Sequence, residues 1–223
     1  VSGKLKIKKR TIYPKLISSF LFAVAALLGV SSITQTIISA APGDYVWSEA
    51  EAGRGLPGQL KNWISIASSA DGTRLVAAVQ GGYIYTSTDS GATWTERTSA
   101  GERYWMSVAS SADGTKLTAA VNGGYIYTST DSGVTWIERA ASGSRSWRSI
   151  ASSADGAKLV AVDPAGSDWT GGYIYTSTDS GATWTERTDA GARNWQSVAS
   201  STDGTKLVAV DPTGSDWTAG YIY

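Results

Sequence analysis

The sequence lacks cysteine and histidine altogether, and it contains only two phenylalanines and one methionine in 223 residues. Without cysteine, the chain cannot hold a disulfide framework, a zinc ribbon or a thiol nucleophile. Without histidine, it also lacks the commonest general base and the commonest metal ligand. We therefore expect a protein that works without a cofactor and without a metal ion.

Neither charge sign is in excess overall, but the basic residues are concentrated at one end of the chain. Residues 1–41 contain six basic residues and no acidic one, so residues 42–223 carry 13 basic and 19 acidic groups, a net charge of −6. An acidic domain is a poor match for a phosphate backbone, and we expect no nucleic-acid partner. The six basic residues are Lys4, Lys6, Lys8, Lys9, Arg10 and Lys15.

The basic segment is followed by an apolar run from Leu16 to Val30 and then by small residues up to Ala41. This order is typical of a secretory signal peptide, and we predict cleavage near Ala40 or Ala41. The alternative is an uncleaved N-terminal anchor, because the stretch continued through Ile38 is long enough to span a membrane. Both predict a secreted or extracytoplasmic protein, in the periplasm or at the cell surface, and only the uncleaved form meets a membrane, through this segment.

Two sequence blocks recur at regular spacing after residue 42. The block Trp63–Gly72 returns three times, 42, 42 and 48 residues further on in turn. The block 81–94 returns twice, and the chain stops inside a further copy at Tyr223. Repeats of this length are typical of propeller blades. We divide residues 42–223 into four repeats, at about 47–94, 95–136, 137–184 and 185–223.

Each repeat predicts four short strands separated by turns rich in Gly, Asp and Ser. The second strand is apolar on both faces, so both faces of its sheet should be covered. We predict an all-β fold, a β-propeller of four-stranded antiparallel blades. In the first repeat the predicted strands are Trp63–Ser68, Leu75–Val79, Tyr83–Ser87 and Thr93–Arg97.

About four blades are present, and two ways of completing the ring are open. Residues 44–49 resemble a fourth strand in which Trp47 matches Trp94, so the N-terminal end could complete the last blade. The alternative is that the sequence is a fragment of a six- or seven-bladed ring.

The pattern Ser-x-Asp-x-Gly-x-x-Trp occurs three times and resembles the Asp-box, or BNR, repeat. That repeat is shared by sialidases, sortilin-type receptor domains, xyloglucan-degrading glycoside hydrolases and photosystem II assembly factors of the Ycf48 type. The resemblance implies that each Asp-box turn joins the third and fourth strands of a blade and is structural. Its Asp should accept backbone N–H groups, its Gly should adopt a positive φ, and its Trp should be buried between blades. The Asp-box residues are Ser87, Asp89, Gly91, Trp94, Ser129, Asp131, Gly133, Trp136, Ser177, Asp179, Gly181 and Trp184.

The repeats contain no convergent set of catalytic residues. The arginines and glutamates of the predicted outer strands recur at equivalent positions, which point apart in a propeller and cannot form the close carboxylate pair of a glycosidase. We therefore favour a non-enzymatic binding scaffold. The alternatives are a sialidase-like or glycoside-hydrolase-like module and a protein-binding propeller similar to the photosystem II assembly factors. These repeated residues are Glu96, Arg97, Glu138, Arg139, Glu186 and Arg187.

The connections between strands are of two kinds. The two hairpin turns of each repeat are nearly constant, whereas the strand 4–1 and strand 2–3 connections vary in sequence or length. Alternate connections of a meander share one rim, so we expect a constant rim and a variable rim. Loops on a rigid scaffold usually carry function, and we predict that a protein or glycan ligand binds the variable rim. The candidate binding residues are Trp169, Trp217, Asp168, Asp216, Arg103, Tyr104, Arg145 and Arg193.

Trp169 and Trp217 have two interpretations of equal weight. Each indole either stacks on a ligand or folds back to fill its own loop. A calcium site formed by Asp163 and Asp168 is a weaker alternative, because too few oxygen ligands are evident.

Overall fold

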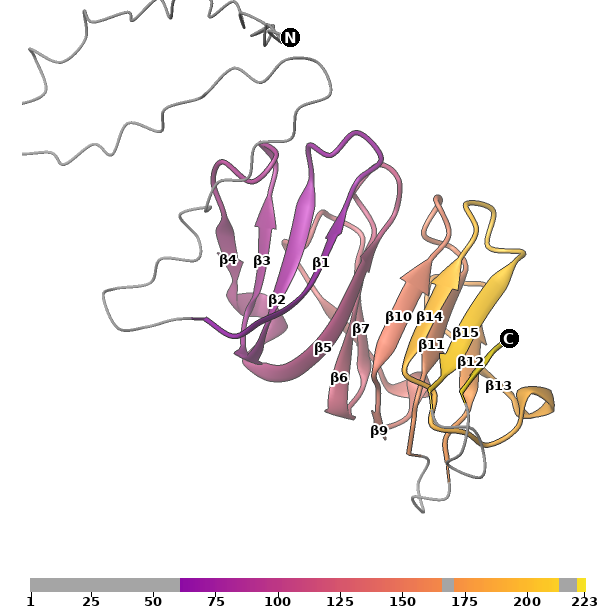
Figure 1. Cartoon of the computed structure of the whole chain (residues 1–223). Coiled ribbons are helices and arrows are strands. Elements are labelled where there is room, and N and C mark those ends of the chain that lie inside the picture. Colours follow the sequence, from indigo (N-terminus) through magenta and orange to yellow (C-terminus); the bar gives the residue numbers. More distant parts are fainter. Residues whose placement is uncertain (1–60, 166–170, 213–219) are drawn as a thin grey trace, which may run out of the picture. The chain divides into compact units, whose positions relative to one another are not determined.

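The computed structural model describes residues 61–165, 171–212 and 220–223, all of which belong to the compact unit Ser48–Tyr223. Regular structure within these ranges is almost entirely antiparallel β, in sheets of nine, four and three strands, and the pairing of β2 with β5 joins the first two blades into the nine-stranded sheet (Figure 1). The predicted all-β architecture is confirmed. The N-terminal segment 1–41 lies outside the described residues, and so do Asp168, Trp169, Asp216 and Trp217. Within the described ranges, no helix is both long enough and apolar enough to cross a membrane.

The strands form four blades, numbered 1 to 4 along the chain. Blade 1 contains β1 (Trp63–Ser68), β2 (Leu75–Gly82), β3 (Ile84–Ser87) and β4 (Thr95–Arg97). Blade 2 contains β5 (Arg103–Ser110), β6 (Leu117–Gly124), β7 (Ile126–Ser129) and β8 (Ile137–Arg139). Blade 3 contains β10 (Ser149–Ser152), β11 (Leu159–Val162), β12 (Ile174–Ser177) and β13 (Thr185–Arg187), and the short β9 (Arg145–Ser146) precedes it. Blade 4 contains β14 (Ser197–Ser200), β15 (Leu207–Asp211) and β16 (Tyr221–Ile222).

Single turns of 3-10 helix follow the outer strands of blades 1 to 3. They are η3 (Thr98–Ala100), η4 (Ala140–Ser142) and η5 (Thr188–Ala190). Each outer strand pairs with the third strand of its own blade. Blade 1 therefore ends at Arg97, whereas the sequence repeat was divided at Trp94.

The strands of blade 1 match the predicted ones closely, and the differences have local causes. The outer strand begins at Thr95 rather than Thr93, because Asp89 holds the Thr93 N–H in the preceding turn. The second strand continues to Gly82, because Gln80 and Gly82 pair with β5 of the next blade. The inner strand of blade 1 has the predicted bounds.

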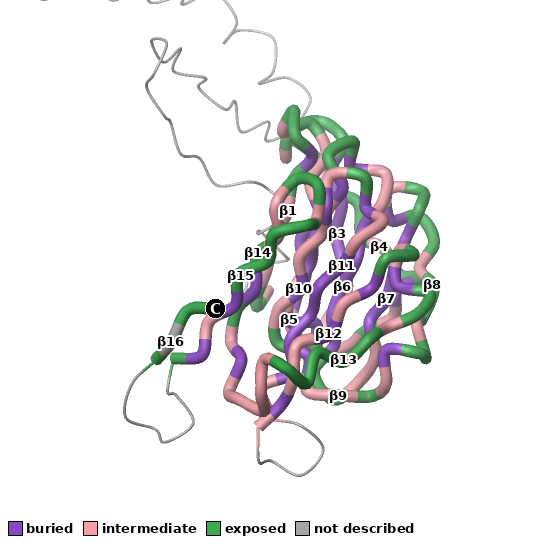
Figure 2. The backbone as a smooth tube through the Cα atoms, turned by 90° about the vertical axis from the view of Figure 1, so that its right-hand side faces the viewer, coloured by how far each residue is buried: buried purple, intermediate pink, exposed green. Residues whose placement is uncertain are grey.

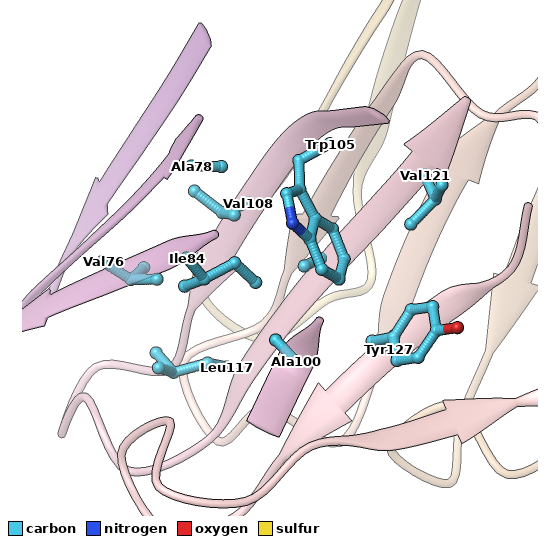
Figure 3. Packing of buried hydrophobic residues seen from close by; sticks show 10 residues of the cluster. Val76, Ala78, Ile84, Ala100, Trp105, Val108, Leu117, Val121 and Tyr127 are labelled. Atoms are coloured by element: carbon cyan, nitrogen blue, oxygen red, sulfur yellow. The ribbon is translucent and has the colours of Figure 1, made fainter. Parts of the chain in front are cut away.

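Neighbouring blades pack face to face through apolar side chains. At the first junction, Val76 and Ile84 of blade 1 meet Val108 and Trp105 of blade 2, and all four are buried (Figure 3). Fully burying one side chain of the Val or Ile type contributes about 1.5–3 kcal/mol, so each junction is a substantial part of the stability. Equivalent clusters join blades 2 and 3 and blades 3 and 4.

The inner strands of successive blades are also joined by a repeated polar contact. The Ser65 hydroxyl accepts the N–H of Val108 at 3.1 Å, and the hydroxyls of Ser107 and Ser149 accept the corresponding N–H groups of the next blades. A small hydroxyl residue therefore suits the inner end of a blade, because it satisfies an edge N–H that would otherwise be left without a protein acceptor.

The constant turns of successive blades are hydrogen-bonded in a row. The N–H of Ala70 donates to the carbonyl of Ala112 at 2.7 Å, Ala112 donates to Ala154, and Ala154 donates to Thr202. Within blade 1, the N–H of Ser90 donates to the carbonyl of Thr73, so the two constant turns of one blade lie together. The constant rim is thus confirmed as a single continuous surface.

Two glycines test how closely the blades approach each other. Gly133 and Gly123 both have a positive φ, of 85° and 72° respectively. A Cβ added at Gly133 would lie 2.8 Å from the Thr86 side chain of the neighbouring blade, whereas a Cβ added at Gly123 would have no neighbour within 4 Å. Both changes to Ala incur a left-handed backbone penalty of roughly 1–2 kcal/mol. We expect Gly133→Ala to destabilise more than Gly123→Ala in urea unfolding. Equal losses would contradict tight packing at this junction.

Candidate functional site

The Asp-box turns are closed networks of internal hydrogen bonds. Asp89 accepts the N–H of Thr93 at 2.8 Å and the hydroxyls of Thr93 and Ser87, while the N–H of Gly91 donates to the Ser87 hydroxyl. The indole N–H of Trp94 donates to the carbonyl of Gly91 at 3.0 Å. Asp131 and Asp179 repeat the arrangement. The predicted acceptor role of the Asp is therefore confirmed.

These hydrogen bonds favour the charged form of each carboxylate. Donation from Thr93 and Ser87 lowers the pKa of Asp89 to about 2, and donation from Thr183 and Ser177 does the same for Asp179. Slight burial acts against the shift at Asp131, but donation from Thr135 still lowers its pKa to about 2. The carboxylates are thus held ionised as structural acceptors.

A second aspartate turn, which the sequence indicated only as a hairpin, has the same design. Asp71 lies in the turn between β1 and β2, where it accepts the Ser69 hydroxyl at 2.5 Å and the N–H of Thr73 at 3.0 Å. Donation from Ser69 and Thr73 lowers the pKa of Asp71 to about 2. The recurring Ser-x-Asp-Gly-Thr spacing was the signal for this network. Asp113, Asp155 and Asp203 occupy the equivalent turns.

The burial of the tryptophans differs from the prediction. The Asp-box Trp94, Trp136 and Trp184 are only half-buried, because each lies toward the edge of its blade and ends on the carbonyl of its own turn. The fully buried indoles instead lie near the start of the inner strands of blades 2 to 4, within β5 or two residues before β10 and β14. These are Trp105, Trp147 and Trp195, each at 0% exposure.

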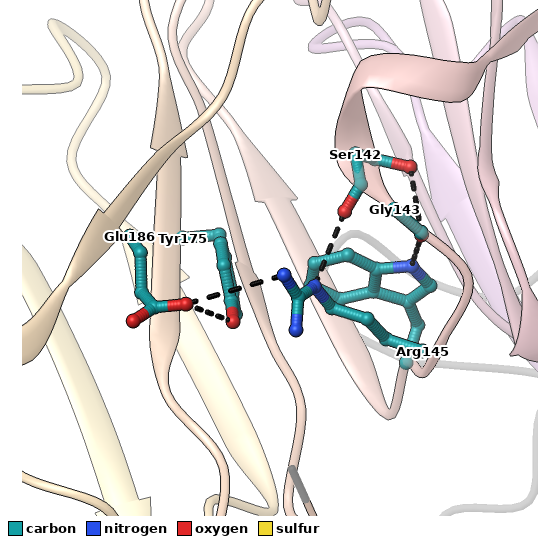
Figure 4. Close-up of polar contacts among 6 residues, drawn as sticks. Ser142, Gly143, Arg145, Tyr175 and Glu186 are labelled. Atoms are coloured by element: carbon teal, nitrogen blue, oxygen red, sulfur yellow. Dashed lines mark hydrogen bonds and ion pairs between the residues drawn. The ribbon is translucent and has the colours of Figure 1, made fainter. Parts of the chain in front are cut away.

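Each blade carries a cation stacked on a tyrosine, and in blades 1 to 3 the tyrosine also donates to a glutamate. In blade 3 the guanidinium of Arg145 lies 4.4 Å from the centre of the Tyr175 ring, and the Tyr175 hydroxyl donates to Glu186 at 2.6 Å (Figure 4). The Arg145 Nε also donates to the carbonyl of Ser142, and its Nη2 lies 4.0 Å from Glu186. Trp147 packs edge-on against the same tyrosine.

The other blades repeat this stack. Arg103 lies over Tyr127 at 4.5 Å, Arg193 over Tyr223 at 4.7 Å and, in blade 1, Lys61 over Tyr85 at 4.7 Å. Burial and donation to Glu138 raise the pKa of Tyr127 to about 12, so the phenol remains a neutral donor. A cation over an aromatic face contributes about 0.5–2 kcal/mol, depending on its exposure. Arg103, Arg145 and Arg193, which the sequence predicts as binding residues, are therefore each engaged with a tyrosine of the fold.

The variable connections meet at one rim, as predicted. Gln80 pairs with Tyr104, and Gly82 pairs with Arg103, so the strand 2–3 connection of blade 1 lies beside the link into blade 2. The same pairing joins Gly124 to Arg145 and Gly172 to Arg193. On this rim, Tyr104 is 66% exposed. The structure thus brings Arg103, Tyr104, Arg145 and Arg193 to one rim.

Two buried aspartates lie at the bases of the longer strand 2–3 loops. Asp163 and Asp211 occupy the position held by Val79 and Val121 in the first two blades, at the end of the second strand. The Asp163 carboxylate accepts the N–H of Ala165 at 3.1 Å, which fixes the start of its loop. Among the residues that the structure describes, no group of three or more acidic side chains is placed to hold a metal ion.

The repeated outer-strand residues are each engaged within one blade. Arg97 Nε donates to the Thr86 hydroxyl at 2.7 Å, and Arg139 and Arg187 make the same bond to Thr128 and Thr176. Glu96, Glu138 and Glu186 each accept a tyrosine hydroxyl of their own blade. These groups therefore serve the individual blades and do not assemble a shared active site.

A cavity of about 370 Å³ lies between blades 3 and 4, lined in part by Thr176, Arg187 and Leu207. At the preceding junction, Gly181 of an Asp-box turn packs against Thr128, Arg139 and Leu159, which are the equivalent residues. The cavity therefore coincides with the position that an Asp-box turn occupies at an earlier junction.

These features define a propeller-type repeat of four-stranded blades, and comparison with solved structures agrees. The chain is similar to the GH74 enzyme of Niastella koreensis (TM-score 0.52, 23% identity, 70% of this chain and 24% of that chain). It is also similar to YCF48 bound to D1 peptide (TM-score 0.55, 18% identity, 73% of this chain and 50% of that chain). Both are β-propellers, and at these identities the likeness establishes the fold alone.

A third similar structure is the computationally designed Ika4 protein, with a TM-score of 0.53 and 10% identity over 76% of this chain and 94% of that one. The chain thus spans about a quarter of the GH74 enzyme and half of YCF48. No protein-family model matches the sequence, and no curated protein matches it either.

The aspartate turns predict acid sensitivity. Their folded-state pKa values of about 2 lie below the ordinary 3.8, so their contribution to stability is complete above about pH 4 and is lost as the pH falls toward 2. We expect the midpoint of urea unfolding to fall steeply over this range. The triple variant Asp89→Asn, Asp131→Asn, Asp179→Asn should be less stable at pH 7 and show a shallower fall.

Asp189→Asn, at an exposed carboxylate on η5, serves as the control and should leave the midpoint at pH 7 unchanged. An unaltered pH dependence in the triple variant would contradict the structural role of the turns.

Proposed function

We propose that this chain is an exported, non-enzymatic propeller scaffold that binds a protein or glycan ligand on its variable rim. The observation that carries the proposal is the division between the rims. The repeated ionisable groups serve turns, stacks and outer strands, whereas the strand 4–1 and strand 2–3 connections, which include Tyr104 and Gln80, differ among the blades in sequence or length. A rigid frame with one varied surface is the usual design of a binding scaffold.

A protein or peptide ligand is the better supported of the two classes. YCF48, which has the same fold, has been solved with a D1 peptide bound. On this chain, Tyr104 presents an aromatic ring at 66% exposure, and exposed tyrosines are common anchors of protein interfaces. The guanidinium of Arg103 already stacks on Tyr127 and bonds the carbonyl of Ala100, so Tyr104 is the more available neighbour.

A carbohydrate-active module is the second candidate, favoured by the likeness to GH74 enzymes. Hydrolysis would need two carboxyl groups about 5–9.5 Å apart. The repeated glutamates of blades 1 to 3 do not offer such a pair, since each is bonded to a tyrosine of its own blade. Glycan binding without hydrolysis is consistent with the proposal, and Trp169 and Trp217 are the predicted stacking residues for it.

The rim proposal is tested by screening the full chain against peptide and glycan arrays and then measuring the affinity for a probe that binds. Removing the exposed aromatic anchor in Tyr104→Ala should weaken binding by about tenfold or more. Thr88→Ala, an exposed position in the β3–β4 turn of the constant rim, is the matched control and should bind as the parent does.

Equal effects of the Tyr104 and Thr88 changes would place the ligand elsewhere. Hydrolysis of a sialoside or β-glucan from the array would overturn the non-enzymatic proposal. Glycan binding that survives both Trp169→Ala and Trp217→Ala would refute the stacking role of these two residues.

The export proposal makes a separate prediction. The chain recovered from the extracytoplasmic fraction should begin near residue 41 or 42, as determined by N-terminal sequencing. Replacing Leu21 and Leu27 by Arg should interrupt the apolar run and retain the chain inside the cell. Recovery of the altered chain outside the cell would contradict a signal peptide, and an untrimmed chain in the membrane fraction would indicate the anchor.

A further inference from the structure

Each junction between blades joins a back face of one blade to a front face of the next. On the front face, Val108, Ile150 and Val198 hold equivalent positions in blades 2 to 4 and are 4–8% exposed. On the back face, Val76, Thr118 and Val160 hold equivalent positions in blades 1 to 3 and are 0–2% exposed. The chain therefore builds the same interface three times.

The two outermost faces of the arc carry the same residues but are open. On the front face of blade 1, Ile66 corresponds to Val108 and is 64% exposed. On the back face of blade 4, Val208 corresponds to Val76 and is 42% exposed, and Ile222 corresponds to Ile84 and is 77% exposed. Figure 2 shows exposed residues along β1 and β14–β16, whereas β6 and β11 of the inner blades are mostly buried. The front face of blade 1 and the back face of blade 4 are thus the two complementary sides of a junction between blades.

We propose that two copies of this chain associate head to tail, with the back face of blade 4 of one copy packed on the front face of blade 1 of the other. Each open face would then be covered by the kind of face that covers its equivalent at the three junctions within one copy. Such an interface is heterologous, so it generates either a closed ring or a longer chain of copies.

The polar contacts of the junctions extend across the proposed interface in register. The Ser149 hydroxyl accepts the N–H of Val198, and by the same spacing the Ser197 hydroxyl would accept the N–H of Ile66 in the second copy. The N–H of Ala154 donates to Thr202, and the next member of this row would join the N–H of Thr202 to the carbonyl of Ala70.

A charged contact continues the same series. Lys116 Nζ donates to the carbonyl of Asp155 at 2.8 Å, and Lys158 Nζ donates to the carbonyl of Asp203 at 2.9 Å. Lys206 is the next lysine in the row, and its equivalent acceptor is the carbonyl of Asp71 in the second copy. An unrelated partner would have to reproduce the apolar, hydroxyl and lysine positions together, whereas a second copy supplies all three. We therefore commit to self-association.

The test measures the mass of the full-length chain by size-exclusion chromatography with light scattering over a series of concentrations. The parent should associate reversibly. Ile66→Asp and Val208→Asp each place a charge in the interface and should raise the dissociation constant by about tenfold or more. The repeats supply conservative counterparts: Ile66→Val and Val208→Thr copy residues found at native junctions and should keep the association.

Mixing the two Asp variants distinguishes head-to-tail packing from a symmetric contact. The Ile66→Asp chain retains an intact back face and the Val208→Asp chain retains an intact front face, so the mixture should form pairs of one copy each and no larger species. Ile137→Asp, at a 52% exposed position on the outer strand of blade 2, is the control and should associate like the parent.

Folding of each variant is checked by thermal unfolding followed through tryptophan fluorescence. Because Ile66 and Ile222 are exposed within one copy, Ile66→Asp and Ile222→Asp should unfold like the parent at concentrations where the parent is monomeric, and Ile222→Asp replaces Val208→Asp if the latter unfolds early. A parent that stays monomeric at every concentration would overturn the proposal. Association that persists in both Asp variants, as expected if the apolar segment 16–30 caused it, would overturn it equally.

Discussion

Each blade is a sheet with two apolar faces, and this constraint determines the rest of the structure. A strand such as Leu75–Gly82 has nothing polar to turn toward water along its buried half, so a neighbouring blade must cover each side. Stability then belongs to the junctions more than to the individual blades, as in other repeat proteins. The charged side chains of the described residues lie on the turns, the outer strands and the rims, and there a ligand can meet them.

The turns divide this polar surface into two parts with different tasks. On the constant rim, carboxylates such as Asp71 and Asp89 are occupied by hydroxyl and N–H donors of their own turns, and the turns of successive blades are bonded in a row. On the variable rim, the cation–tyrosine–glutamate stacks tie each link to the blade that it enters. The stacks hold the base of the rim rigid and leave residues such as Tyr104 free to differ among blades.

Local chemistry explains which features could be predicted from sequence. The strands and the two rims follow from turn residues and strand spacing, which act over a few neighbouring positions, and β1 has its predicted bounds. The burial of Trp94 was overestimated, because whether an indole at the edge of a sheet is covered depends on the next blade. The stack of Arg103 on Tyr127 was missed for a different reason: 24 residues of sequence separate the two, and only the folding of β5 beside the rest of blade 2 brings them together.

The near-identity of the junctions has a consequence for how such a chain changes over generations. Unequal recombination between the coding segments of two repeats deletes or adds one whole blade. Because the three junctions are built from equivalent residues, the shortened or lengthened product can keep the same apolar contacts at its new boundary. Blade number is therefore a property that recombination between repeats can change while the packing between blades is preserved.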